Sequence, residues 1–158
     1  IRAMRVGGWS GLIQAIGRSE SLLRSTWQLD GAAVADGIAR IHGETSSILK
    51  YNDENSLTCT IFIAYYSAKV YYMDPIMEMP SGKGFADVVY LPRRGVDKPA
   101  LVVELKWDKS AKGAMAQIKD KEYGEWILGY TGEVLLVGIG YDKGKKTHQC
   151  VIETYEKK

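Results

Sequence analysis

Hydrophobic residues in the first fifth of the chain recur at steps of three and four positions. Such spacing predicts a first helix whose apolar stripe contains Leu12, Ile13, Ile16, Leu23 and Trp27. Asp30 then offers an N-cap for a second helix, and Gly43 is a plausible end for that helix. A third helix is expected to begin near residue 52 or 53. Its apolar side would present Leu57, Ile61, Ala64, Tyr65 and Ala68.

After residue 70 the pattern becomes typical of strands. We expect strands over residues 71–79, 85–91 and 100–107, a helix over 109–130, and strands over 134–141 and 148–155. Pro75 interrupts the first strand and suits an edge position, whereas segment 134–141 is apolar enough to be buried on both faces. The order predicts an α/β or α+β fold with a mixed sheet. We expect residues 1–50 to form an N-terminal helical segment beside a domain spanning 51–158.

The predicted strand 100–107 carries two charges among apolar residues. Because side chains alternate across a strand, Glu104 and Lys106 share one face with Val102, and the other face is wholly apolar. An unpaired charge in a central strand costs several kcal/mol, so two on one face need a reason. If strands 85–91 and 100–107 form a hairpin whose loop centres near Gly95, Asp87 falls opposite Glu104.

Two arrangements explain these charges. Opposed carboxylates with Cβ atoms about 4.5–5.5 Å apart repel each other, and a divalent cation relieves the repulsion more than Lys106 alone does. An oxygen-rich site of this kind suits Mg²⁺ or Mn²⁺ rather than zinc. The alternative is a buried salt bridge in which Lys106 neutralises one carboxylate and the other faces water. Spacing alone is compatible with both arrangements.

The composition of the chain excludes few classes of function. The chain is 46% hydrophobic and 25% charged with a formal net charge of +2, as in ordinary globular proteins. Such a balance neither requires nor excludes a nucleic-acid partner. Contacts to nucleic acid would come from two local clusters, for which solvated turns are the alternative: Arg93, Arg94 and Lys98, and Lys143, Lys145 and Lys146.

Other features bear on location and on metal binding. No apolar run is long enough to span a bilayer and no signal peptide opens the chain, so a cytoplasmic location is expected. The chain begins at Ile1, which indicates a piece of a longer protein. No cysteine or histidine spacing is typical of a zinc site. His42 and His148 are expected in surface or capping roles.

Residues 84–87 (Gly-Phe-Ala-Asp), followed by Glu104, Leu105 and Lys106, resemble the signature of the PD-(D/E)XK nucleases. The chain resembles more specifically the PD-(D/E)XK domain at the C-terminus of bacterial AAA-ATPase-like proteins, over about residues 51–153 and strongly over 82–142. The resemblance implies a restriction-endonuclease-like core of order αβββαβ(β). It also implies a nuclease that uses Mg²⁺ or Mn²⁺.

The resemblance also implies roles for individual residues. Asp87 matches the aspartate of the signature, with Ala86 in place of proline, and Glu104 and Lys106 match the (D/E)XK pair. The metal ligands implied are Asp87, Glu104 and the backbone carbonyl of Leu105.

Two further residues match family positions outside the signature. Gln117 matches a glutamine on the helix after the core strands, which in many members faces the site or the DNA backbone. Glu54 matches an acidic residue that many members place near the metal. Alternatively, the helix dipole alone favours a carboxylate such as Glu54 in the first turn of a helix.

The function expected from this resemblance is hydrolysis of phosphodiester bonds in nucleic acid, with DNA favoured, as the C-terminal domain of a larger ATPase-like protein. One alternative is a non-catalytic module that binds nucleic acid or protein and regulates the ATPase. Another is a purely structural domain whose charges pair internally. The expected partners are DNA and an attached or associated ATPase domain. A homo-oligomer is also compatible with the sequence.

Overall fold

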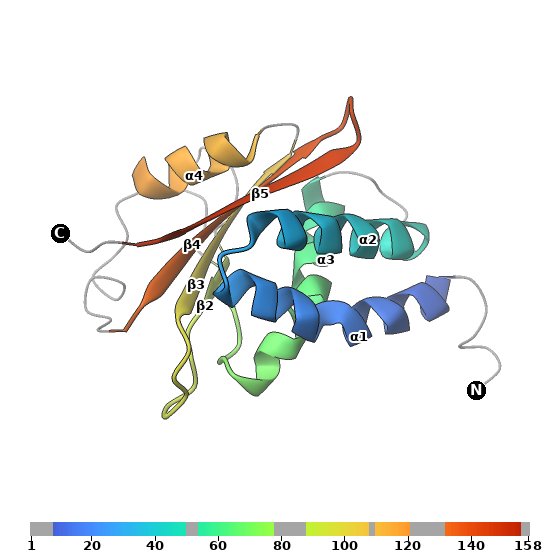
Figure 1. Ribbon diagram of the computed structural model, residues 1–158. Coiled ribbons are helices and arrows are strands. Elements are labelled where there is room, and N and C mark those ends of the chain that lie inside the picture. The colour runs from blue at the N-terminus through green and yellow to red at the C-terminus, as the bar shows by residue number, and fades with distance from the viewer. Residues whose placement is uncertain (1–7, 50–53, 78–87, 108–109, 121–131, 156–158) are drawn as a thin grey trace.

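The structure is a computed structural model that describes residues 8–49, 54–77, 88–107, 110–120 and 132–155 (Figure 1). Within these residues, helices and strands follow the predicted order. The helices are α1 (Gly8–Trp27), α2 (Gly31–Leu49), α3 (Glu54–Ala64), the 3-10 helix η2 (Tyr66–Val70) and α4 (Ala111–Asp120). The strands are β1 (Ile76–Met77), β2 (Val88–Tyr90), β3 (Ala100–Trp107), β4 (Val134–Asp142) and β5 (Thr147–Thr154).

The strands form one mixed sheet in the order β1-β2-β3-β4-β5. Strands β3 and β4 are parallel, and the other neighbouring pairs are antiparallel. Strand β4 lies inside the sheet and residues 134–141 of it are buried, which confirms the prediction made from its continuous apolar run. The mixed α/β class is likewise confirmed.

The hairpin of β2 and β3 has the predicted register. Val88 pairs with Val103 and Tyr90 pairs with Leu101, so the connecting loop is centred next to Gly95. Gly95 has a φ of +82°, a left-handed conformation that glycine adopts without steric cost. Asp87, for which the register was predicted, lies outside the described residues.

Helices cover both faces of the sheet (Figure 1). On one face, α1, α2 and α3 contribute Leu23, Ile38 and Ile61 to a core that also contains Leu105 and Ile139 from the sheet. On the other face, α4 contributes to a smaller cluster that holds Val89, Ala100, Val102, Met115, Val134 and Leu136. Ala111, Ala114 and Met115 of α4 are buried.

The N-terminal helices agree with the sequence pattern in part. Asp30 caps α2 through its Oδ1, which accepts a hydrogen bond from Ala33 N at 3.1 Å, as predicted. The expected end at Gly43 is wrong, because α2 continues to Leu49. Burial of His42 and its neighbour Ile41 outweighs a glycine penalty of about 1 kcal/mol. Ile13 is 55% exposed and does not join the core.

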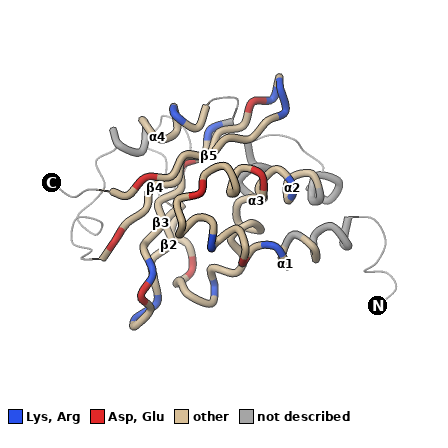
Figure 2. The backbone as a smooth tube through the Cα atoms, viewed as in Figure 1, with Lys and Arg blue, Asp and Glu red and all other residues tan. Residues whose placement is uncertain are grey.

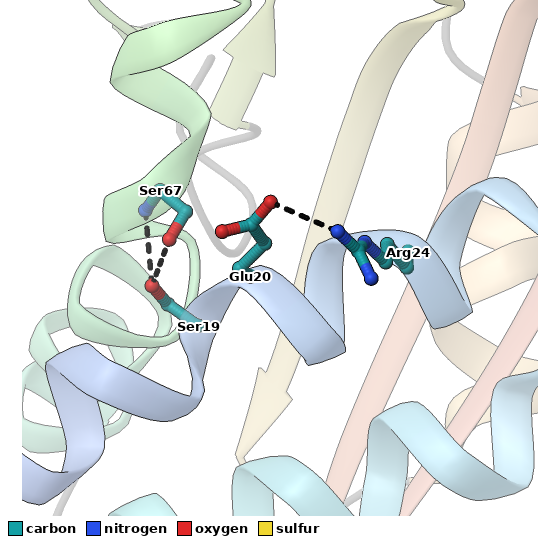
Figure 3. A network of polar contacts seen from close by, with 4 residues as sticks. All are labelled: Ser19, Glu20, Arg24 and Ser67. Carbon is teal, nitrogen blue, oxygen red and sulfur yellow. Dashed lines mark hydrogen bonds and ion pairs between the residues drawn. The ribbon is translucent and has the colours of Figure 1, made fainter.

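Residues of the N-terminal segment share a core with the sheet domain. One buried cluster contains residues of α1 and α2 together with Leu135 and Val137 of β4. The helical residues in it are Leu22, Leu23, Val34, Ile38 and Ile41. Polar contacts add to this packing: Ser19 Oγ of α1 hydrogen bonds to Ser67 Oγ and accepts from Ser67 N at 3.1 Å (Figure 3). The division of the chain into a helical segment (1–50) and a domain (51–158) stays a prediction.

The predicted strand 71–79 is divided where Pro75 stands. Before the proline, Met73 N donates to Leu91 O at 2.9 Å and Tyr72 forms an isolated bridge with Pro92. After it, the edge strand β1 consists of Ile76 and Met77. Residues 78 and 79 lie outside the described part. None of the helices that the structure describes is both long and apolar enough to cross a membrane.

Candidate active site

The two charges of β3 are buried inside the protein. Strand β3 lies between β2, which pairs with residues 101–103, and β4, which pairs with residues 100–107. Glu104 is 0% exposed and Lys106 is 7% exposed. Both residues make polar or electrostatic interactions in the structure. A buried carboxylate and a buried ammonium therefore stand two residues apart on one face of a central strand, about 6.6 Å apart along it.

Glycines of β4 lie beside these charges. In the parallel pairing of β3 with β4, Glu104 is opposite Gly138 and Lys106 is opposite Gly140. A Cβ atom on Gly138 would lie 2.9 Å from Ala111 O and 3.0 Å from Met115 N. Helix α4 therefore rests directly on the backbone of β4, on the face that carries Glu104. This close approach explains why a charged strand face is shielded from water.

The first turn of α4 is fixed at the end of the sheet. Ser110 Oγ accepts a hydrogen bond from Gly113 N at 3.1 Å, which satisfies one donor of the helix N-terminus. Ala111 N donates to Gln149 Oε1 of β5 at 3.3 Å, and Gln149 pairs with Gly140. Gln149 thus ties α4 to the strand end beside Lys106. No sequence pattern singled out this residue.

The other predicted site residues are located only in part. Asp87 lies outside the described residues, and for Glu54 and Gln117 the structure describes the backbone but not the side chain. Gln117 lies within α4, the helix that covers the Glu104 face. Leu105 is buried with its side chain in the core of the opposite face.

Glu54 begins a helix on the other side of the sheet. Helix α3 packs Ile61 and Ala64 into the cluster that holds Leu101, Val103 and Leu105, whereas Glu104 and Lys106 point to the opposite face because side chains alternate along β3. The role of Glu54 stays a prediction.

The residues that the structure describes contain no group of three or more His, Cys, Asp and Glu side chains suited to a metal ion. They supply Glu104 and the carbonyl of Leu105, which are hard oxygen donors of the kind that Mg²⁺ prefers. The chemistry of this partial donor set fits a magnesium ion. It does not fit zinc, which favours sulfur and nitrogen ligands.

The structure brings together two histidines that the sequence left apart. His42 Nδ1 of α2 lies 2.9 Å from His148 Nε2 of β5, and the ring of Tyr141 is 4.7 Å from the ring of His148. The expectation of surface or capping roles is wrong, since His42 is buried and His148 half-buried. Burial, and secondarily the nearby His42, lower the pKa of His148 to about 4.

Comparison with known proteins identifies the family. No curated protein matches the chain. Residues 52–150 match the sequence model of the PD-(D/E)XK nuclease superfamily, and this segment covers well over half of the chain and includes β3. The five-stranded mixed sheet with helices on both faces is consistent with the restriction-endonuclease-like fold of that superfamily. The chain therefore belongs to the PD-(D/E)XK nuclease superfamily.

Proposed function

We propose that this protein is a metal-dependent nuclease that hydrolyses phosphodiester bonds of nucleic acid, with DNA as the favoured substrate. The observation that carries the proposal is the fully buried carboxylate of Glu104 beside the buried ammonium of Lys106 on a central strand. Burying two charges carries a desolvation penalty that can exceed their mutual attraction, so stability alone does not explain them. Buried ionisable groups that lie together are frequent at functional sites.

The register of the hairpin supports Asp87 as the second carboxylate. Val88 is the last described residue of β2 on this side, and it pairs with Val103. One further step of the same antiparallel ladder would pair Asp87 with Glu104. Directly opposed residues have Cβ atoms about 4.5–5.5 Å apart, a separation that one divalent cation can bridge.

In this proposal Asp87, Glu104 and the carbonyl of Leu105 hold Mg²⁺ or Mn²⁺, with Glu54 as a further candidate ligand. When bound, the ion lowers the pKa of a coordinated water and neutralises charge on the phosphate. The chain's own groups then complete the site. Lys106 orients the attacking water or stabilises a non-bridging phosphate oxygen. Gln117 on α4 contacts the substrate backbone or the site.

The setting of the domain is part of the same proposal. The resemblance of segment 82–142 supports a C-terminal nuclease domain attached to, or associated with, an ATPase-like protein. A cytoplasmic location fits this setting.

Cleavage of DNA by matched carboxylate variants tests the proposal. Wild type should cut supercoiled plasmid or single-stranded DNA only with Mg²⁺ or Mn²⁺, and Glu104→Gln should lose about two orders of magnitude or more of that activity. Glu133→Gln is the control, because it makes the same chemical change at an exposed position. Equal cutting by wild type and Glu104→Gln would overturn the proposal.

Metal binding gives an independent readout. Calorimetric titration with Mn²⁺ should show heat for wild type and Glu133→Gln. It should show little or none for Asp87→Ala and Glu104→Gln. Metal binding without cleavage would instead favour a non-catalytic module that regulates the ATPase.

A further inference from the structure

Three lysines stand at the same end of the sheet as the candidate active site. Because β3 and β4 run parallel, their C-terminal ends meet at one edge, and Lys106 is level with Gly140 in the pairing. The turn between β4 and β5 follows directly and contains Lys143, Lys145 and Lys146. Figure 2 shows these basic residues at the tip of the β4–β5 hairpin.

The distance suits contacts along one nucleic-acid substrate. Lys143 is three residues beyond Gly140, which corresponds to about 10 Å along the chain direction of β4. Strand β4 itself lies about 4.8 Å from β3. A duplex rises about 3.4 Å per base pair. A phosphate bound at the turn would therefore be roughly three base pairs from a phosphate bound beside Lys106.

The turn holds its backbone in a defined conformation. Asp142 Oδ1 accepts hydrogen bonds from Gly144 N at 2.9 Å and from Lys145 N at 3.1 Å. Lys146 adopts a φ of +55°, an uncommon conformation for a residue with a side chain. The three lysine side chains are exposed. Asp142, at the end of β4, thus holds the backbone of the turn, and the three lysines are presented on the surface.

The other basic cluster, Arg93, Arg94 and Lys98, lies at a different end of the sheet. Arg93 Nε donates to Lys69 O at 3.0 Å, and Lys98 Nζ lies 4.2 Å from the ring centre of Trp27. These contacts hold the β2–β3 loop against η2 and α1. That loop precedes Ala100, so it lies at the opposite end of β3 from Lys106. Arg93 and Lys98 thus have structural partners, and the loop is remote from the site.

We infer that the β4–β5 turn is a nucleic-acid contact, in which Lys143, Lys145 and Lys146 bind backbone phosphates of the strand that enters the site beside Glu104 and Lys106. This inference rests on the proposed function for the identity of the substrate. Phosphate contacts by lysine are electrostatic and independent of base sequence. The turn therefore contributes affinity and orientation without sequence preference.

Binding of a fluorescent DNA duplex, measured by anisotropy in EDTA so that no cleavage occurs, tests the inference. Lys143→Gln/Lys145→Gln removes two charges from the turn, and Lys69→Gln/Arg94→Gln removes two exposed charges from the other end of the molecule as a matched control. The turn variant should bind about ten- to a hundred-fold more weakly at low salt. Its slope of log K against log salt should fall by about 2, because each phosphate contact contributes about 0.9.

The outcomes separate this inference from the proposed function. An equal loss of affinity in both variants, an unchanged salt slope, or no binding by wild type would overturn the inference. If the turn variant binds like wild type while Mg²⁺-dependent cleavage persists, the contact is wrong and the nuclease proposal stands. If the turn variant alone loses binding but wild type never cleaves, the contact stands and the nuclease proposal is wrong.

Discussion

Gly138 lies opposite Glu104 in the parallel pairing of β4 with β3, and its missing side chain lets α4 rest directly on the sheet beside the buried carboxylate. The added Cβ of an alanine would meet backbone atoms of Ala111 and Met115, which have no freedom to rotate away as a flexible side chain does. The burial of the charged face therefore depends on a glycine in a neighbouring strand.

Replacing Gly138 with alanine should displace α4 and open the site. We expect a loss of stability of about 1–3 kcal/mol, as is typical of overpacking, together with reduced cleavage. Urea unfolding measures the loss of stability, and the plasmid assay measures the reduced cleavage. Gly17→Ala is the control, because no atom lies within 4 Å of the added Cβ and alanine stabilises a helix interior by about 0.5–1 kcal/mol. A Gly138→Ala protein as stable as wild type would contradict the close packing.

Lys106→Met tests the role proposed for Lys106. Methionine keeps much of the side-chain volume, but it leaves the buried carboxylate of Glu104 without the positive charge beside it, so we expect a loss of stability of about 3–5 kcal/mol and a lower melting temperature. If Lys106 has the proposed role of stabilising the phosphate, cleavage should fall about a hundred-fold or more when this cation is lost. Lys112→Met, on the exposed side of α4, should leave both quantities unchanged. Full activity in Lys106→Met would remove Lys106 from the site.

A hydrogen-bonded tyrosine connects the N-terminal helix to the base of the β2–β3 hairpin. Tyr72 is fully buried, and its hydroxyl accepts from Trp27 Nε1 at 2.8 Å and donates to Pro99 O at 2.6 Å. Tyr72→Phe removes the hydroxyl that is the hydrogen-bond partner of both Trp27 Nε1 and Pro99 O. This loss should lower the free energy of unfolding by about 1–3 kcal/mol. Urea unfolding measures the loss. Tyr66→Phe removes an exposed hydroxyl and should change stability by less than about 0.5 kcal/mol.

The sequence predicted the features that follow from local periodicity. The bounds of β3 follow from the strand pattern of 100–107, the burial of β4 from its continuous apolar run, and the register from a hairpin loop centred near Gly95. The roles of Asp87, Glu54 and Gln117 rest on the family resemblance and stay predictions.

Contacts between distant segments were not predictable in this way. His42 and His148 are 106 positions apart in the chain, and no local pattern records that α2 crosses β5 at that point. The close approach of α4 to Gly138 is similar, because a glycine inside an apolar strand is equally compatible with a bulge. The extension of α2 past Gly43 reflects tertiary packing that overrides helix propensity.

The pair of His42 and His148 should make stability depend on pH. His148 Nε2 can donate to His42 Nδ1, and His148 Nδ1 is buried with no hydrogen-bond partner in the described part of the structure. A second proton would place a charge on that buried nitrogen, which agrees with a pKa lowered to about 4 by burial and by His42. The folded state therefore binds fewer protons than the unfolded state between pH 4 and the ordinary value of about 6.5.

The sign of the effect follows from this difference in bound protons. Stability from His148 is fully present above about pH 6.5 and is lost as the pH falls towards 4. We expect the melting temperature of wild type to fall by a few degrees more between pH 7 and pH 5 than that of His148→Gln, which keeps a neutral polar group. Carboxylate titration is common to both proteins and cancels in the comparison. Parallel melting curves across this range would show that His148 does not keep its neutral form in the folded protein.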